Sequence, residues 1–119
     1  MSKHVLIVED EPNIVESLSF LLERAGFEVS SEPDGAMAMD RIGALKPDLI
    51  ILDVMLPNRS GFDILRDLGE LAEAPHVLML TAKGQARDRQ TAEAIGVTRF
   101  MTKPFANAEI IKAVQEMLA

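Results

Sequence analysis

The sequence predicts an α/β fold, a doubly wound parallel sheet of five strands in the order 2-1-3-4-5 with helices on both faces. Two observations predict it. Five short apolar runs alternate with longer amphipathic stretches along the 119 residues, and three of these runs are continuous and aliphatic. Continuous apolarity is typical of strands that are covered on both faces, as in a parallel sheet. The length is that of one domain, and residues 1–119 are expected to form it.

Each apolar run is predicted to be a strand. The continuous runs at Val5–Val8, Leu49–Leu52 and Val77–Leu80 are expected in the interior of the sheet. The runs at Phe27–Ser30 and Arg99–Thr102 are shorter or more polar, which favours edge positions.

A helix is predicted after each strand, from apolar residues at helical spacing and from capping residues. The expected helices cover Ile14–Ala25 before Gly26, Gly35–Leu45 after an Asp34 cap, a stretch from the Ser60 cap to about Leu71, Arg87–Ile95 before Gly96, and a last helix lined by Ile110, Val114 and Met117 or Leu118. Four phenylalanines are expected in the core, namely Phe20, Phe27, Phe62 and Phe105. The charged run Arg87–Arg89 is interpreted as a solvated face.

Composition excludes several classes of function. The chain carries 12 basic and 19 acidic residues, a net charge of −7, which disfavours direct binding to nucleic acid or to an anionic membrane. It has no cysteine, tryptophan or tyrosine, so disulfides, thiolate metal sites and base-stacking platforms are not expected. No apolar run approaches the ~18 residues of a membrane span, and we expect a cytoplasmic protein.

Reactive side chains follow the predicted strands. Glu9 and Asp10 come after the first strand, Asp53 after the third, Thr81 ends the fourth, and Lys103 follows the fifth. In a doubly wound sheet, ligands bind outside the carboxyl ends of the strands. The sequence therefore predicts a site at that edge.

The residue types at this edge indicate phosphoryl chemistry. Clustered carboxylates repel one another, and a hard cation such as Mg²⁺ relieves that repulsion while holding phosphoryl oxygens. Asp53 can then act as a nucleophile that forms an aspartyl phosphate. Lys103 supplies a positive charge for the same group, and Thr81 a hydroxyl donor.

Four motifs in order resemble the receiver domain of bacterial two-component response regulators, a flavodoxin-like (βα)₅ fold of the chemotaxis-regulator kind. The motifs are Val8-Glu9-Asp10-Glu11-Pro12, the run from Pro47 through Asp53 to Pro57 with Gly61 after it, Met79-Leu80-Thr81-Ala82, and Thr102-Lys103-Pro104-Phe105. The resemblance covers the whole chain.

The resemblance implies a role for each matching residue. Asp53 would be the phosphoacceptor, and it would share Mg²⁺ with Asp10 and the main-chain carbonyl of Met55, with Glu9 acting through a metal-bound water. Mn²⁺ or Ca²⁺ would substitute in crystals. Lys103 would contact the phosphoryl group.

The resemblance also implies a switch and partners. Thr81 and Phe100 would move together on phosphorylation, and the face formed by the fourth helix, fifth strand and fifth helix would be read by an output protein. The phosphoryl donor would be a sensor histidine kinase or a histidine phosphotransfer protein. We expect a phosphoacceptor rather than an enzyme, without an output domain, as a monomer or a weak phosphorylation-dependent dimer.

Two departures from the family pattern bear on rate and switching. Met55 and Lys83 occupy positions that tune the access of water to the acyl phosphate, and apolar Met55 is expected to slow its hydrolysis. Phe100 stands where many relatives carry tyrosine, so its switching would be steric. The family usually has a cis bond at Lys103-Pro104, which the sequence alone leaves open.

Three other readings compete with the phosphoacceptor. A phosphohydrolase of the haloacid-dehalogenase kind also uses a strand-end aspartate, but it needs a second Asp where this chain has Met55. A flavin- or nucleotide-binding module would want a glycine- or hydroxyl-rich loop after the first strand, where three acids stand. A receiver that never takes phosphate would keep a purely structural Lys103–Asp53 ion pair.

Overall fold

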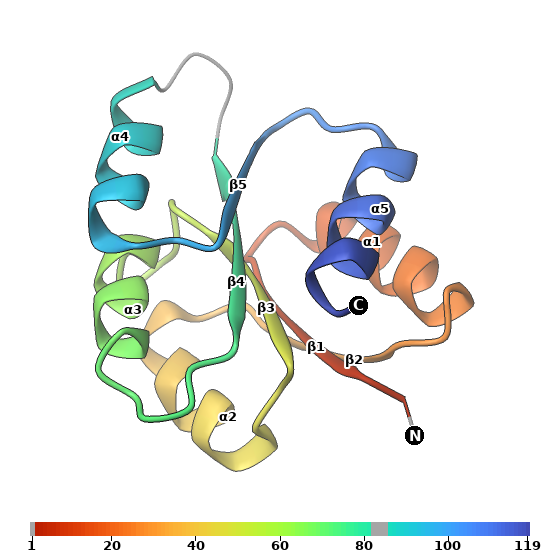
Figure 1. The fold of residues 1–119 in the computed structure, drawn as a ribbon, viewed down its shortest axis with the longest axis horizontal. Helices are drawn as coiled ribbons and strands as arrows, with labels where there is room; N and C mark the ends of the chain where they lie inside the picture. Colours follow the sequence, from red (N-terminus) through yellow and green to blue (C-terminus); the bar gives the residue numbers. More distant parts are fainter. Residues whose placement is uncertain (1, 82–85) are drawn as a thin grey trace.

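The computed structural model describes residues 2–81 and 86–119, which form one parallel sheet in the order β2-β1-β3-β4-β5 (Figure 1). This is the predicted architecture and strand order. The strands are β1 (His4–Val8), β2 (Glu28–Glu32), β3 (Leu49–Asp53), β4 (His76–Thr81) and β5 (Arg99–Thr102). The polar strands β2 and β5 lie at the edges, as their composition predicted.

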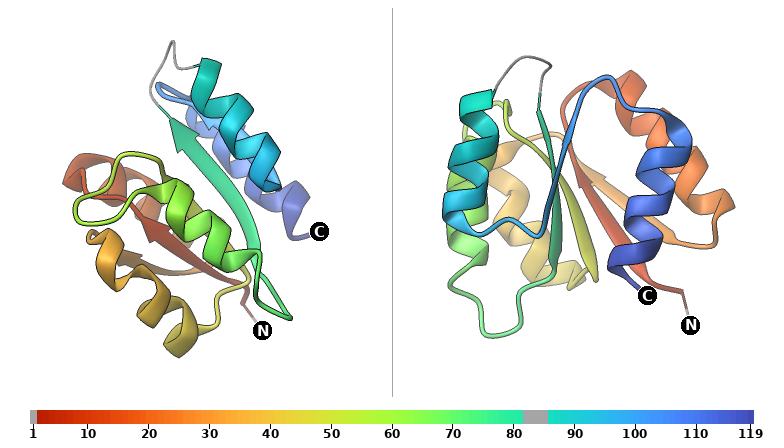
Figure 2. Two further views of the ribbon diagram at one scale, coloured as in Figure 1. Left: turned by 90° about the vertical axis from the view of Figure 1, so that its left-hand side faces the viewer. Right: turned by 45° about the horizontal axis from the view of Figure 1, so that its top comes forward.

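Helices cover both faces of the sheet. Figures 1 and 2 show α1 (Pro12–Arg24) and α5 (Asn107–Met117) side by side on one face. The other face is covered by α2 (Ala38–Leu45), α3 (Gly61–Leu68) and α4 (Ala86–Ile95). Among the described residues, no helix combines the length and apolar character that a membrane span requires.

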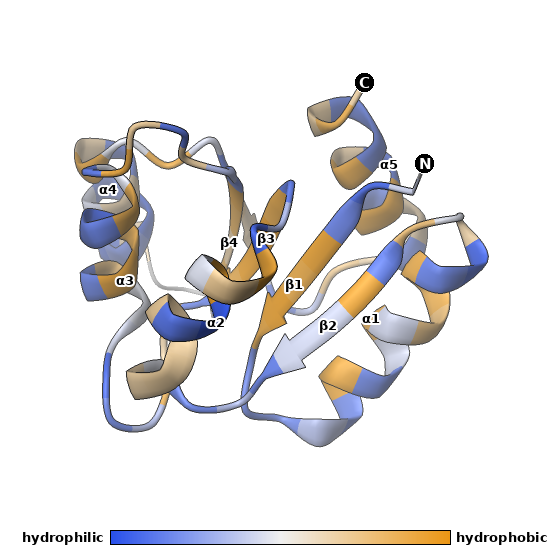
Figure 3. Cartoon of the chain, turned by 90° about the horizontal axis from the view of Figure 1, so that it is seen from below, coloured by the Kyte–Doolittle hydropathy of each residue, from blue (hydrophilic) through white to orange (hydrophobic). Residues whose placement is uncertain are grey.

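The alternation of side chains along each strand divides the core into two layers. In β1, Leu6 and Val8 pack toward α2, α3 and α4, whereas Val5 and Ile7 pack toward α1 and α5. The same alternation runs through β3 and β4. Because both faces are buried, the interior residues of these strands are apolar, which Figure 3 shows as orange along β1 after its hydrophilic first residue.

Two predicted helix boundaries differ from the structure. The predicted helix over Gly35–Leu45 begins as a 3₁₀ turn, η1 (Gly35–Met37), and the Asp34 carboxylate caps that turn by accepting from the Ala36 amide. Helix α3 ends at Leu68, with Gly69 as its C-cap, and so is shorter than predicted.

Phe20 does not belong to the core, because its side chain is 59% exposed. The buried residues of α1 are Leu18 and Leu22, and a residue midway between them points to the opposite side of the helix. The Arg24 guanidinium lies 5.5 Å from the centre of the Phe20 ring. Phe27, Phe62 and Phe105 are partly buried against the core.

Gly61 permits the closest approach between α3 and the sheet. Its amide donates to the Val54 carbonyl at 2.9 Å, so the first residue of α3 lies directly against the end of β3. A Cβ at this position would stand 2.1 Å from the Asp53 carbonyl oxygen. The segment that carries Asp53 therefore requires glycine here.

We predict that Gly61→Ala lowers the free energy of unfolding by ~2 kcal/mol or more, because the added carbon collides with backbone. Chemical denaturation of the purified protein measures this change. Gly43→Ala is the matched control, since a Cβ there meets nothing within 4 Å and alanine favours the interior of α2. Equal stability of the two variants would contradict this account of the α3–β3 contact.

Candidate functional site

Three carboxylates converge at the carboxyl edge of the two central strands. Strands β1 and β3 pair with Val8 opposite Leu52, so the residues that follow, Glu9 and Asp53, are neighbours. Glu9, Asp10 and Asp53 each offer an oxygen that lies within 4.8 Å of the other two. The sequence placed these residues at one edge, and the structure brings them together.

Glu9 and Asp53 are buried, whereas Asp10 is exposed. The Glu9 Oε2 atom accepts from the amides of Asp10 at 3.0 Å and Glu11 at 3.3 Å, which fixes the carboxylate beside the start of α1. Burial raises the pKa of Glu9, the hydrogen bond from Lys103 opposes that effect, and the charge of Asp53 adds to it, so that the pKa lies at about 7.

The ammonium group of Lys103 neutralises part of this negative charge. The Nζ atom donates to Glu9 Oε1 at 2.6 Å and lies 3.3 Å from Asp53 Oδ1 and 3.7 Å from Glu11 Oε1. Burial on its own lowers the pKa of Lys103, but the hydrogen bond to Glu9 and the charge of Asp53 outweigh it, so the pKa lies above its ordinary value. The group therefore stays charged.

Backbone contacts hold Lys103 in place. Its amide donates to the Thr81 carbonyl at 2.7 Å, which joins the end of β5 to the end of β4. The Lys103-Pro104 bond is cis, which answers the question that the sequence left open.

Asp53 borders a hollow between α1 and the segment that precedes α5. The hollow has a volume of about 750 Å³, and its lining includes Asp10, Asn13, Asp53, Met55 and Lys103. Met55 stands at the mouth with 76% of its side chain exposed. Lys83 lies outside the described residues.

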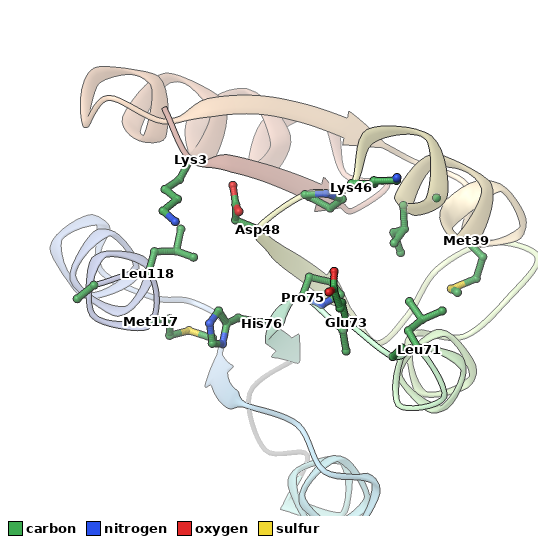
Figure 4. A pocket seen from close by; sticks show the side chains of 16 residues that line it. Lys3, Met39, Lys46, Asp48, Leu71, Glu73, Pro75, His76, Met117 and Leu118 are labelled. Carbon is green, nitrogen blue, oxygen red and sulfur yellow. The ribbon is translucent and has the colours of Figure 1, made fainter. Parts of the chain in front are cut away.

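A second hollow lies at the opposite edge of the sheet, near the amino ends of the strands (Figure 4). Its volume is about 690 Å³, and Lys3, Asp48 and His76 line it together with apolar residues such as Met117. It includes none of the residues predicted to carry the chemistry. The predicted reactive residues Glu9, Asp10, Asp53, Thr81 and Lys103 lie instead at the carboxyl edge.

Thr81 and Phe100 lie near the site but face a different helix. Thr81 ends β4 and is buried, and its Oγ1 atom donates to Asp88 Oδ2 on α4 at 3.0 Å. The Phe100 ring lies 5.9 Å from the Arg89 guanidinium on the same helix. Arg87 and Arg89 are exposed, as the interpretation of a solvated face predicts, but Asp88 is half-buried against Thr81 and Arg89 also contacts Phe100, two contacts that the interpretation did not include.

The residues at the edge fit a hard divalent cation. Carboxylate oxygens are the ligands that Mg²⁺ prefers, and three of them are close enough to share an ion. Lys103 contacts Glu9 and Asp53 from one side, and Asp10 remains exposed. The cluster is thus partly neutralised and partly open to solvent.

The comparisons with known proteins agree with this geometry. A family model described as the response regulator receiver domain matches residues 5–115. The chain belongs to this family. Receiver domains are signalling phosphoacceptors of two-component systems rather than classical enzymes, and the family works with histidine kinases.

The receiver domain has relatives across its whole length. It is 39% identical over 118 residues to the alkaline phosphatase synthesis transcriptional regulatory protein PhoP of Bacillus subtilis, covering 99% of this chain and 49% of PhoP. It thus spans about half the length of that curated relative.

Solved structures are equally similar in fold. A putative response regulator from Chloroflexus aurantiacus has a TM-score of 0.94 at 29% identity, with 99% of this chain and 98% of that chain covered. The BeF3-activated receiver domain of RstA from Klebsiella pneumoniae has a TM-score of 0.90 at 26% identity, with 98% of each chain covered.

We predict that the stability of the metal-free protein falls as the pH rises from 4.5 to about 7. The folded chain binds a proton on Glu9 through this range and the unfolded chain does not, so unfolding releases a proton. Denaturation at several pH values measures the slope, and Glu9→Gln should reduce it. The same dependence of stability on pH in Glu9→Gln and in the wild type would contradict the raised pKa of Glu9. In the wild type, millimolar Mg²⁺ should reduce this dependence, because the cation favours ionised carboxylates.

Proposed function

We propose that this receiver domain is a Mg²⁺-dependent phosphoacceptor that takes a phosphoryl group on Asp53 from a histidine kinase or a histidine phosphotransfer protein. The observation that carries the proposal is the position of Asp53. Asp53 is 4% exposed, its carboxylate lies 3.3 Å from the Lys103 ammonium, and it belongs to a cluster of acids that borders a hollow. A nucleophile, a counter-charge and space for a donor side chain thus occur together.

The transfer consists of one bond formed and one broken. An Asp53 carboxylate oxygen attacks phosphorus, the phosphorus–nitrogen bond to the donor histidine breaks, and the electron pair leaves with the imidazole nitrogen. Lys103 supplies a fixed positive charge beside the attacking carboxylate and the incoming phosphoryl oxygens.

The acids have a second task, which is to hold the cation. Asp10, Asp53 and the main-chain carbonyl of Met55 would bind it directly, with Glu9 acting through water. When bound, the cation neutralises the acids and orients the phosphoryl oxygens. Glu9, hydrogen-bonded to two amides and to Lys103, would keep a fixed orientation through the reaction.

The output would pass through α4, β5 and α5. Thr81 and Phe100 connect the site to that face, since one ends β4 beside Lys103 and the other lies in β5 against α4. An output protein would read the change. The cytoplasmic location and the monomer or weak phosphorylation-dependent dimer remain predictions.

A phosphohydrolase of the haloacid-dehalogenase kind is disfavoured by the same geometry. That chemistry needs an acid two residues after the nucleophile, and here Met55 presents an exposed apolar side chain. Turnover of phosphate esters in place of a stoichiometric product would favour it.

We predict that acetyl phosphate with Mg²⁺ adds one phosphoryl group to the wild type and none to Asp53→Asn. Intact-protein mass spectrometry measures the addition, and removal of Mg²⁺ by a chelator should suppress it. Asp40→Asn is the matched control, because Asp40 is an exposed aspartate on α2 that belongs neither to the acid cluster nor to the lining of the hollow beside Asp53. An unmodified wild type would favour the receiver that keeps only a structural ion pair.

We predict that Met55→Asn accelerates loss of the phosphoryl group several-fold, because an amide at the mouth of the hollow can orient water where the thioether excludes it. The measurement is the decay of phosphorylated protein after removal of the donor. Leu71→Asn makes a similar exposed change at the opposite edge and should leave the decay unchanged. An unchanged rate in Met55→Asn would refute the water-exclusion role.

A further inference from the structure

The Thr81 hydroxyl already donates a hydrogen bond in this structure. Its single proton is donated to the Asp88 carboxylate at 3.0 Å, and Thr81 is 2% exposed, so water has little access to it. A hydroxyl has one proton to donate. While Asp88 accepts that proton, no phosphoryl oxygen can.

Thr81 and Asp53 face opposite sides of the sheet. Along β4, Val77 and Met79 pack in the layer under α2, α3 and α4, and the alternation gives Thr81 the same side. Along β3, Leu49 and Ile51 belong to the layer under α1 and α5, which gives Asp53 that side. The Thr81 hydroxyl must therefore leave the α4 side before it can turn toward a group on Asp53.

Arg89, the residue after Asp88 on α4, contacts the Phe100 ring. Arg89 places its guanidinium 5.9 Å from the Phe100 ring, within the range of a cation–π contact, and its Nε lies 3.4 Å from Glu93 Oε1. Two consecutive residues of one helix thus contact both residues of the expected switch.

We propose that Asp88 and Arg89 form a latch that holds Thr81 and Phe100 in the resting arrangement. In this latch, Asp88 competes with the phosphoryl group on Asp53 for the Thr81 hydroxyl. The proposal rests on the proposed function of Asp53 and Thr81. Asp88 is a positioning residue, because it acts through Thr81 and touches no reacting atom.

The latch gives the phosphoryl group a means of moving α4. When the hydroxyl turns to the phosphoryl oxygens, Asp88 loses its partner and the first turn of α4 loses one of its two contacts to the switch residues. The cation–π contact alone is the weaker tether at an exposed position. Phosphorylation at one sheet edge thereby changes the α4–β5–α5 face.

Removal of Asp88 should favour the active arrangement. We expect Asp88→Ala to be phosphorylated by acetyl phosphate on the order of tenfold faster than the wild type, the factor that a charge-assisted hydrogen bond of about 1.4 kcal/mol represents. A variant that merely destabilises the fold would be slower. Asp88→Asn keeps an acceptor oxygen without the charge and should fall between the two.

A double-mutant cycle isolates the hydrogen bond. Thr81→Val removes the hydroxyl, so Asp88→Ala should add nothing in that background. Gln90→Ala, an exposed change in the same helical turn, is the control and should behave as the wild type. Equal rates for Asp88→Ala and the wild type, or a full effect without the hydroxyl, would overturn the latch.

Amide spectra without phosphate separate this proposal from the proposed function. In unphosphorylated Asp88→Ala, the resonances of Thr81, Phe100 and α4 should move toward those of the wild type treated with beryllofluoride and Mg²⁺. Unmoved resonances would overturn the latch. If beryllofluoride leaves the amide spectrum of the wild type unchanged, the proposed function fails. The latch is then tested by whether Asp88→Ala alone shifts the resonances of Thr81 and Phe100 together.

Discussion

The contact between Lys103 and the buried acids is the interaction on which the site depends. Glu9 and Asp53 stand at the ends of two paired central strands, and neither carboxylate is open to bulk water. Without a counter-charge, two such groups would repel each other and resist ionisation. Lys103 reaches both from the end of β5, an edge strand, and so links this outer strand to the centre of the sheet.

The same ammonium group makes the edge chemically useful. A buried ion pair adds little to stability when its charges could be replaced by apolar groups. Here the pair places the Asp53 carboxylate, the proposed nucleophile, beside the positive charge of Lys103, and Asp10 is exposed in the same cluster. The arrangement is more consistent with a site built for phosphoryl chemistry than with a structural bridge.

The two faces of the sheet divide the work at this edge. The acids continue the side-chain rows that pack against α1 and α5, and Thr81 continues the row that packs against α4. In the proposed mechanism, nucleophilic attack and metal binding would occur on one side of the sheet and the conformational response on the other. A phosphoryl group on Asp53 can contact the Thr81 hydroxyl only if the Thr81 side chain moves from the α4 side across the end of β4.

The continuous apolar runs predict a parallel sheet, because strands buried on both faces must be apolar at every interior position. The doubly wound order 2-1-3-4-5 then places the first and third strands side by side, so the convergence of the acids could also be predicted. The start of α2 and the end of α3 were less predictable, since a 3₁₀ turn and an early cap depend on local backbone geometry. Phe20 was wrongly expected in the core because its side chain is apolar, whereas its angular position on α1 turns it away from the sheet.

The contact between Thr81 and Asp88 was harder to predict than the acid cluster. Seven positions separate the two residues, and four of the residues between them, 82–85, lie outside the part of the chain that the structure describes. Nothing in the local sequence specifies where the helix that follows will place its first acid. Alternation along β4 predicts the side to which Thr81 turns, but only three-dimensional packing identifies its acceptor.

A crystal structure of the protein with beryllofluoride and Mg²⁺ tests the central claim most directly. The account predicts beryllium bonded to an Asp53 oxygen, the cation held by Asp10 and Asp53, and Lys103 and Thr81 both contacting fluoride, with Asp88 released. Beryllofluoride absent from Asp53, or bound there with the hydrogen bond between Thr81 and Asp88 intact, would contradict it.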